Sequence, residues 1–446
     1  MWKPSIEQPC ERANLSRLMD YATTQSQDTQ YRAIDVGIAF AAATALAAAV
    51  ALTIRPSAPV SPLRVAVLND IIAGRSIAYT PYPVGYIAFA AVAIRWFGMR
   101  GLAAAQGALY VATVLLAYAT LCTLRVSNRV ALAGALAVAV YPNMLFAITR
   151  FMDTGPSCFL LSAFAYLVVR LKKDGLSTAN AAIGGTLFGL MLLVRPNTLT
   201  LAPIAVWAAF AGRGLTAVRL ARLLGASVLA LGIAAAVVVP LKGRFVLFDR
   251  YNAAYTLANG THEHALEGMR RDYNGEMAMA QSIRELGLPI YGMERSDPVA
   301  ADQYMRVAWN FIREHPFRYA VLEAFKVVNL FRPDYRNVNQ SVIPPAIGRT
   351  IHTVITALFF AWAALRWRCR HFYGLGDGLI LIPMLVFYFA PFVATQADPR
   401  YRIPIDVLFI VDCAFCLSML KQSWDARAGF VGRAAPRAAT SCAAVN

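Results

Sequence analysis

The sequence predicts an all-α polytopic membrane protein, and three observations predict it. The 446 residues are 58% hydrophobic and only 15% charged, which leaves too little polar surface for a soluble domain. The apolar residues come in runs, and a helix needs about 20 largely apolar residues to cross a bilayer. Basic residues gather in the short connectors between the runs, as is typical of the cytoplasmic side of a membrane.

About ten runs are candidate transmembrane helices, because only a helix or a closed barrel satisfies its backbone within lipid. The first 33 residues are polar and show no cleavable signal, so the first span is expected at 34–54. The remaining runs are 102–123, 130–148, 156–170, 179–194, 198–212, 223–241, 351–365, 378–395 and 403–420.

The basic connectors predict the topology. Five clusters fall on one side of the membrane if the apolar segment 81–98 lies along the surface instead of crossing it. The cytoplasmic clusters are then Arg125 and Arg129; Arg170, Lys172 and Lys173; Arg213, Arg219 and Arg222; Arg366, Arg368 and Arg370; and Lys421, Arg427, Arg433 and Arg437.

This topology divides the chain into three parts. The transmembrane domain is expected at 34–420, between a cytoplasmic segment at 1–33 and a cytoplasmic tail at 421–446. Two large extracytoplasmic loops lie at 55–101 and 242–350. The second loop is expected to contain two helices broken at His315-Pro316, of which the second is amphipathic and suits the membrane surface.

Several classes of function have little support. The net charge of +17 comes without a basic patch interleaved with aromatics, so we expect membrane lipids and no nucleic acid as partners. Cys413 and Cys416 lie inside an apolar run without a second pair, so no zinc site or disulfide framework is predicted. His262 and His264 have no third ligand placed by the sequence, so no metal site is predicted, although a divalent ion stays possible.

Five segments in order along the chain carry a resemblance. They are Tyr82-Pro83-Val84-Gly85-Tyr86 after Ala73-Gly74; Tyr141-Pro142 with Arg150-Phe151-Met152-Asp153; Gly189 to Arg195-Pro196; Glu314-His315-Pro316 with Phe331-Arg332-Pro333; and Asp398-Pro399-Arg400-Tyr401-Arg402-Ile403-Pro404. In order and spacing they resemble the GT-C class of integral-membrane glycosyltransferases. The closest resemblance is to the family of protein O-mannosyltransferases and the lipid A aminoarabinose transferase.

The resemblance implies a GT-C-like fold and an enzyme of the bacterial inner membrane with a periplasmic active face. Such an enzyme moves a sugar from a polyprenyl-phosphate carrier to an envelope glycan, a lipid or a protein, with inversion at the sugar carbon and without a cofactor. The reaction needs a carboxylate for the acceptor hydroxyl and cations for the departing phosphate.

The chain departs from the family where the usual base is found. Family members place an acidic residue about 15 residues before the first-loop glycine, whereas 55–69 contains no acidic residue. Asp153 and Asp70 are therefore the two candidates for the catalytic carboxylate. The simpler interpretations are that Asp153 caps a helix and that Asp70 is solvated and paired with Arg64 or Arg75.

The substrate-binding candidates are mainly arginines, since a planar guanidinium suits a phosphate. Arg400 and Arg402 flank Tyr401 at an outer turn, where they could instead contact lipid headgroups. Arg195 ends an apolar helix, where a charge is functional or paired with an acid such as Asp406. The resemblance and the basic first loop add Arg150, Tyr82, Tyr86 and Arg75.

Two other functions stay open. A non-catalytic subunit of the same fold would explain the missing first-loop acid. A transporter would place ionisable residues at the middle of several helices and show paired halves, whereas the charges here gather at helix ends and no repeat is visible.

Overall fold

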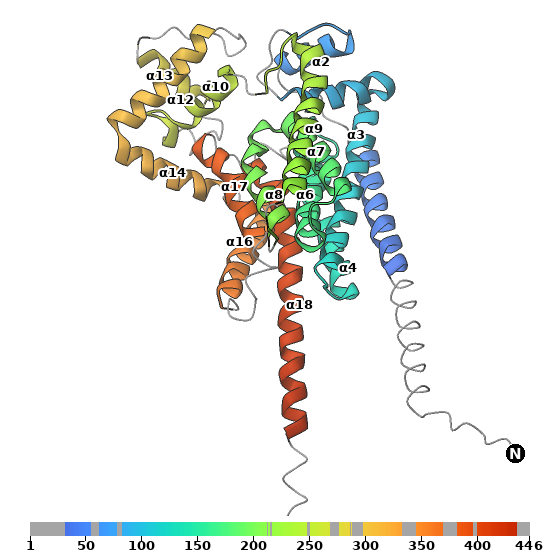
Figure 1. Cartoon of the computed structure of the whole chain (residues 1–446). Coiled ribbons are helices and arrows are strands. Elements are labelled where there is room, and N and C mark those ends of the chain that lie inside the picture. Colours follow the sequence, from blue (N-terminus) through green and yellow to red (C-terminus); the bar gives the residue numbers. More distant parts are fainter. Residues whose placement is uncertain are drawn as a thin grey trace, which may run out of the picture.

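The chain forms helices and no strand in the part that the structure describes (Figure 1). The computed structural model describes residues 32–54, 62–77, 83–211, 213–214, 216–247, 250–267, 276–285, 287, 298–331, 345–368, 381–395 and 399–434. Each of the predicted apolar runs contains a helix. The all-α prediction is thus confirmed for these residues.

Five helices are long and apolar enough to cross a membrane. They are Arg32–Thr53, α3 (Val84–Thr123), α6 (Thr154–Asp174), α9 (Ala217–Lys242) and the part Ile403–Lys421 of α18 (Ile403–Ala434). The other bundle helices are α2 (Pro62–Ile72), α4 (Asn128–Ala139), α5 (Pro142–Ala147), α7 (Thr178–Val194), η1 (Pro196–Leu201), α8 (Ala202–Phe210), α16 (Pro345–Arg368), α17 (Leu381–Ala394) and η2 (Pro399–Arg402).

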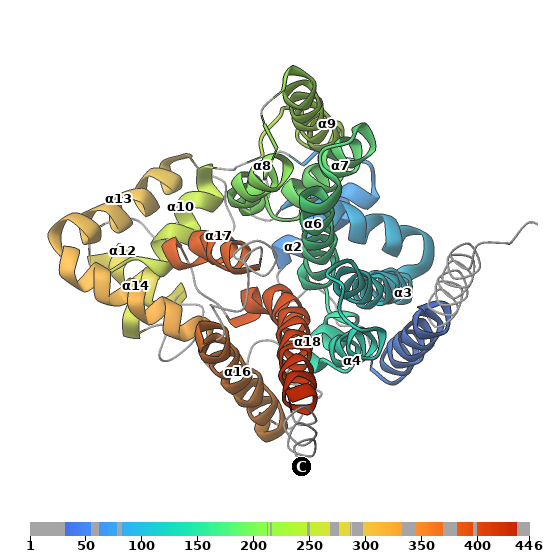
Figure 2. The same cartoon turned by 60° about the horizontal axis from the view of Figure 1, so that its bottom comes forward.

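Helix α6 lies in the middle of the bundle and contacts α3, α7, α8 and α18 (Figure 2). Of its 18 most apolar residues, 78% are buried, against 17% for α9. Because α6 has neighbours on all sides, both of its ends are fixed relative to the rest of the bundle. Asp153 stands at one end and Lys172 and Lys173 at the other.

Small residues bring α7 and α9 into close contact. A side-chain carbon added to Gly185 would lie 2.5 Å from the Ala226 carbonyl oxygen, and one added to Gly189 would lie 2.7 Å from that of Ala230. Small residues four apart let two helix backbones approach, as in helix pairs within membranes. This contact holds the end of α7, which precedes Arg195, against α9.

Helix α3 changes direction at Gly98, which has φ 64° and ψ −166°. A residue with a side chain rarely adopts this conformation, so the glycine permits the bend. Figure 1 shows the first part of α3 lying across the upper end of the bundle and the second part running along it. The segment 84–97 therefore has a different direction from the run 102–123.

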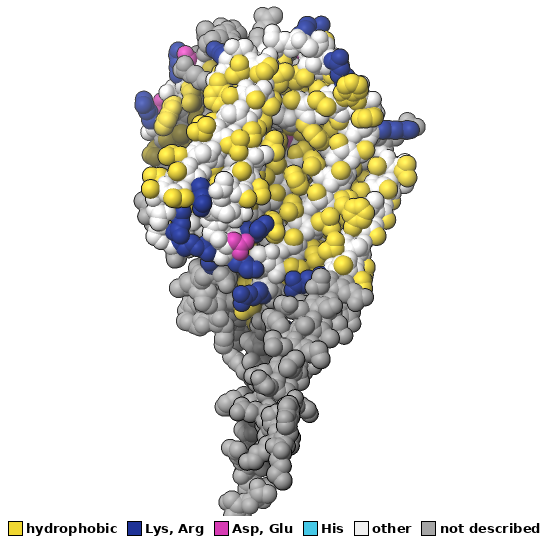
Figure 3. Space-filling view, turned by 45° about the vertical axis from the view of Figure 1, so that its right-hand side comes forward, with side chains coloured by type: hydrophobic (Ala, Val, Ile, Leu, Met, Phe, Trp, Pro, Cys, Tyr) yellow, Lys and Arg dark blue, Asp and Glu magenta, His cyan; other side chains and the backbone are white. Residues whose placement is uncertain are grey.

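Basic side chains lie at both ends of the bundle. Figure 3 shows a broad apolar face with Lys and Arg side chains at its lower margin and others around its upper margin. At the end of α6, Arg213 donates to the carbonyls of Leu171, Lys172 and Lys173, and Arg222 donates to that of Leu176. These bonds satisfy carbonyls that a helix C-terminus leaves open.

Helices α10 (Arg250–Gly260), α12 (Glu276–Glu285), α13 (Pro298–Glu314) and α14 (Pro316–Leu330) pack together beside the bundle (Figure 1). His315 separates α13 from α14, at the break that the sequence predicts. Helix α14 has an exposed apolar face with Phe317 (80% exposed) and Val328 (64%), and it buries Leu322 and Lys326 on the other side. It contacts the bundle through α17 and η2.

Candidate functional site

A buried ion pair joins the ends of two bundle helices. Arg195 follows α7 in an extended conformation, as favoured before a proline, and is only 4% exposed. Its Nε donates to Oδ2 of Asp153 over 2.6 Å, and its Nη1 donates to the Tyr388 hydroxyl over 2.8 Å. A buried charge is costly unless it is paired and hydrogen-bonded, so these bonds explain why the guanidinium can lie inside.

Aromatic rings surround the same guanidinium. Its central carbon lies 5.3 Å from the centre of the Tyr401 ring and 5.8 Å from that of Phe392. The Tyr401 and Phe392 rings are stacked, with centres 4.3 Å apart. A cation above an aromatic face gains electrostatic attraction when water is excluded. Helix α17 and the turn η2 therefore fix Arg195 from the side opposite α6 and α7.

The pair extends from the interior to an opening. The Asp153 side chain is 28% exposed, whereas that of Arg195 is 5% exposed. Nη2 of Arg195 is buried and has no hydrogen-bond partner among the described residues. An ordinary buried guanidinium satisfies its donors. The site therefore combines an accessible carboxylate with an unused donor on the cation that holds it.

The interpretation of Asp153 as a helix cap is wrong, and the acid that pairs with Arg195 is Asp153. Asp153 occupies the N-cap position of α6 but its side chain makes no capping hydrogen bond, because its carboxylate is directed to Arg195. Arg195 does not pair with Asp406, because Asp406 is held by Arg402 one helical turn away. The separation of 42 residues between Arg195 and Asp153 gave no sequence signal for their pairing.

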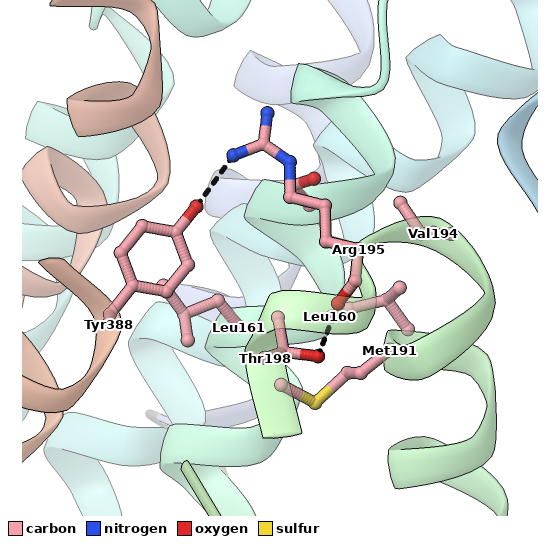
Figure 4. Close-up of a pocket in the computed structure, with 8 residues that line it drawn as sticks. Leu160, Leu161, Met191, Val194, Arg195, Thr198 and Tyr388 are labelled. Atoms are coloured by element: carbon pink, nitrogen blue, oxygen red, sulfur yellow. Dashed lines mark hydrogen bonds between the residues drawn. The ribbon is translucent and has the colours of Figure 1, made fainter. Parts of the chain in front are cut away.

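A small cavity lies beside Arg195. Figure 4 shows it between α6, α7, η1 and α17, with the guanidinium directed to Tyr388. Its lining is mostly apolar and consists of Ser157, Leu160, Leu161, Met191, Val194, Arg195, Thr198 and Tyr388. About 10 Å³ is open to the centre of a water molecule, which is room for about one water.

A second buried network contains the other predicted arginine of the late turn. Arg402 is 1% exposed, and its Nε donates to Oδ1 of Asp406 over 2.6 Å. The Tyr141 hydroxyl donates to Oδ2 of the same carboxylate over 2.6 Å, and Asn143 donates to that hydroxyl.

Arg402 also donates to Thr356 and lies 5.0 Å from the Phe331 ring. These contacts link α18 to α5, α16 and the end of α14.

The described first-loop candidates make contacts with residues other than Asp153 and Arg195. Arg75 and Asp70 form an ion pair at 2.7 Å with both side chains exposed, which is one of the two pairings left open by the sequence. An exposed pair of this kind contributes little to stability. Tyr86 is 5% exposed and its ring meets that of Phe151 edge to face at 5.3 Å. Tyr82 and the Arg400 side chain lie outside the described residues.

Several polar residues of the site region, among them Tyr388 and Gln106, were not predicted from the sequence. Gln106 is 1% exposed and donates from Nε2 to the carbonyl oxygens of Ile148 and Arg150, each over 3.0 Å. Arg150 therefore takes part through its backbone in the turn before Asp153. The available signal was one amide inside an otherwise apolar run.

The histidines of the large loop are engaged in hydrogen bonds. His262 is fully buried and its Nδ1 lies 2.9 Å from the Ser282 hydroxyl. Burial, with the neighbouring His264 and Lys326, lowers the pKa of His262 to about 3. His264 pairs with Glu285 at 2.7 Å. The described residues contain no group of three or more His, Cys, Asp or Glu side chains that could hold a metal ion.

The arrangement at Arg195 offers acid-base and anion-binding chemistry at one place. A part-exposed carboxylate can accept a proton, and a preorganised guanidinium donor can stabilise developing negative charge. No family model, no curated protein and no solved structure matches the chain.

Proposed function

We propose that the protein is a glycosyltransferase that moves a sugar from a polyprenyl-phosphate carrier to an extracytoplasmic acceptor. The observation that carries the proposal is the pair of Asp153 and Arg195. A part-exposed carboxylate is held at 2.6 Å by a buried guanidinium, and this guanidinium keeps one donor nitrogen unused among the described residues. These are the two chemical groups that the transfer needs.

The position of the pair supports a site at the membrane surface. Asp153 and the basic residues Lys172 and Lys173 stand at opposite ends of α6, which is about 30 Å long. If the basic end is cytoplasmic, Asp153 lies at the extracytoplasmic end, where the carrier phosphate of a lipid-linked donor is found. The proposed protein is a bacterial inner-membrane enzyme with about ten spans and both termini in the cytoplasm.

In the proposed reaction the Asp153 carboxylate accepts the proton of an acceptor hydroxyl. The hydroxyl oxygen bonds to the anomeric carbon while the bond from that carbon to the phosphate oxygen breaks. The phosphate leaves with the electron pair and stays on the polyprenyl chain, and the configuration at the sugar carbon inverts. Nη2 of Arg195 is proposed to donate to a phosphate oxygen, together with cations of the late turn.

We favour Arg195 over Arg402 as a ligand of the phosphate because of their acid partners. Asp153, which pairs with Arg195, is 28% exposed, whereas Asp406, which pairs with Arg402, is 3% exposed. Asp153 is similarly favoured over Asp70, whose carboxylate forms an exposed pair with Arg75 and has no buried donor to orient it. The acceptor is an envelope glycan, a lipid or a protein.

The test is transfer of a radiolabelled sugar from polyprenyl phosphate by membranes that contain the protein. We expect Asp153→Asn to lose at least about 100-fold in rate, because the amide cannot accept the proton. We expect Asp70→Asn, at equal expression, to retain most of the rate. The opposite result would move the base to Asp70.

A non-catalytic subunit is the second candidate, and the absence of an acidic residue in 55–69 favours it. It predicts no transfer by the wild-type protein when the donor pool is confirmed by extraction. In that case the Asp153–Arg195 pair serves the fold, and Asp153→Asn changes thermal stability only.

A further inference from the structure

Gln106 is a buried amide in an apolar part of α3. It follows Leu102, Ala103, Ala104 and Ala105 and is 1% exposed. A buried amide costs about 1–3 kcal/mol unless it is hydrogen-bonded. Both hydrogens of its Nε2 go to main-chain carbonyls, those of Ile148 and Arg150 at 3.0 Å each. Carbonyl oxygens accept hydrogen bonds and cannot donate them. The nitrogen end of the amide therefore has to face the two carbonyls.

The two carbonyls belong to the turn that connects α5 to α6. The backbone of this turn closes with short-range bonds, from Ile148 to Leu145, from Arg150 to Ala147 and from Met152 to Arg150. The Arg150 carbonyl accepts from the Met152 N–H. Gln106, more than 40 positions earlier in the chain, adds a second donor to it and also donates to the Ile148 carbonyl. Its amide thereby fixes the backbone three residues before Asp153.

The first turn of α6 is held from two opposite sides. Positions 153 and 155 are about 200° apart around a helix. Asp153 faces Arg195, and the Gly155 side faces Gln106, since a side-chain carbon added there would lie 3.5 Å from its Oε1. Oε1 is buried and has no hydrogen-bond partner among the described residues. Gln106 and Arg195 thus enclose the residue that presents the carboxylate.

We propose that Gln106 is a positioning residue for the Asp153 carboxylate. The role rests on the proposed function, because it assigns the amide to the orientation of the base. Without the two donors, the carbonyls of Ile148 and Arg150 lose their cross-helix bonds and the turn relaxes. A displacement of about 1 Å at a reacting group can cost about 100-fold in rate. The ion pair with Arg195 holds the side chain of Asp153 and makes no bond to the backbone of Ile148 or Arg150.

Three variants test the role. Gln106→Leu removes the donors at similar volume. Gln106→Glu replaces the amide nitrogen by an oxygen of nearly the same size. A protonated carboxyl can donate one hydrogen bond, whereas an ionised carboxylate donates none and repels both carbonyls. Thr113→Val is the matched control, because Thr113 is fully buried in the same helix and its hydroxyl bonds only within that helix, to Leu109.

Hydrogen exchange of the purified protein is the first measurement, because it does not depend on activity. We expect faster amide exchange in 148–153 for Gln106→Leu and unchanged exchange for Thr113→Val. Unchanged exchange in Gln106→Leu would overturn the inference, whether or not the chain transfers sugar.

Transfer kinetics are the second measurement. We expect Gln106→Leu to lower kcat about 30- to 100-fold while KM for the donor changes less than about threefold. Gln106→Glu should lower kcat as well, because the oxygens of an ionised carboxylate repel both carbonyls. Faster exchange with an undiminished kcat would overturn the positioning role. A wild-type chain without transfer would remove that role and the proposed function together, and the exchange result would still show whether Gln106 holds the turn.

Discussion

Arg195 donates to Asp153 over 2.6 Å and so joins the end of α7 to the start of α6. The two residues differ in exposure, because the cation is enclosed by Tyr388, Phe392 and Tyr401 while the carboxylate reaches an opening. A rigid cation behind an accessible carboxylate is preorganised for proton and anion chemistry, since little has to move during the reaction. The relationship places the candidate site where α6, α7, α17 and η2 meet.

Replacement of Arg195 tests this geometry. We expect Arg195→Lys to lose at least about 100-fold in transfer, because a compact ammonium cannot reproduce the fork that holds Asp153 and Tyr388 together. Arg213→Gln is the matched control, since Arg213 bonds only to carbonyls at the far end of α6 among the contacts described, and it should retain transfer. Full activity of Arg195→Lys would show that charge alone suffices.

The contact of α7 with α9 predicts a steric effect. Gly185→Val should lower the thermal unfolding temperature in detergent, because the added atoms meet the Ala226 backbone at 2.5 Å and overpacking costs about 1–3 kcal/mol. Gly232→Ala on α9 should leave that temperature unchanged or raised, since nothing lies within 4 Å of the added carbon. Equal tolerance of both changes would contradict the close helix contact.

The Arg402–Asp406 network predicts non-additive stability. Arg402→Met should destabilise the fold by about 3–5 kcal/mol, since it leaves a buried carboxylate without its cation. The double variant Arg402→Met with Asp406→Leu should regain at least half of the loss, because no charge is then buried alone. Thermal unfolding of the four proteins measures the coupling. Additive losses would show that the two side chains act independently.

His262 predicts a loss of stability in acid. Burial lowers its pKa to about 3, against about 6.5 in an unfolded chain. Between these values the unfolded state binds the extra proton, so the free energy of unfolding falls as the pH falls, by up to about 1.4 kcal/mol per pH unit. The protection factors for hydrogen exchange in α10 and α12, corrected for the intrinsic exchange rate at each pH, should therefore fall below about pH 6.5.

The matched variant for this effect is His262→Asn. Its amide oxygen can accept from the backbone as Nδ1 of His262 does, but it does not titrate. We expect the protection factors of the variant to depend less on pH than those of the wild type. The same dependence in both proteins would assign the acid effect to other groups.

The predicted topology can be tested with an impermeant thiol reagent on whole cells. In a background with the natural cysteines replaced, Arg244→Cys should react, because Arg244 follows α9 at the proposed outer end. Lys173→Cys should react only after the cells are opened, because it lies at the basic end of α6. Both positions are exposed in the structure. A reversed pattern would place Asp153 on the cytoplasmic side and end the proposal of a periplasmic site.

The sequence by itself determined that the described chain is helical, and approximately where its helices lie. Runs of apolar residues predict helices because a helix satisfies the hydrogen bonds of its backbone locally and needs no distant partner. The same reasoning found the break at His315-Pro316, where a proline cannot continue the preceding helix. It also found Arg195 as a candidate, because charges at the ends of apolar helices are rare. Asp153 became a candidate through the family resemblance.

Only the tertiary structure decided which charges meet. Local spacing did not distinguish Asp406 from Asp153 as the partner of Arg195, since both stand at the start of an apolar helix. In the structure Asp406 pairs with Arg402, one helical turn away, and Asp153 pairs with Arg195, 42 residues away in the chain. It also brings Gln106 to the turn before Asp153. Such contacts depend on how helices pack, and packing is determined by side chains distant in the chain.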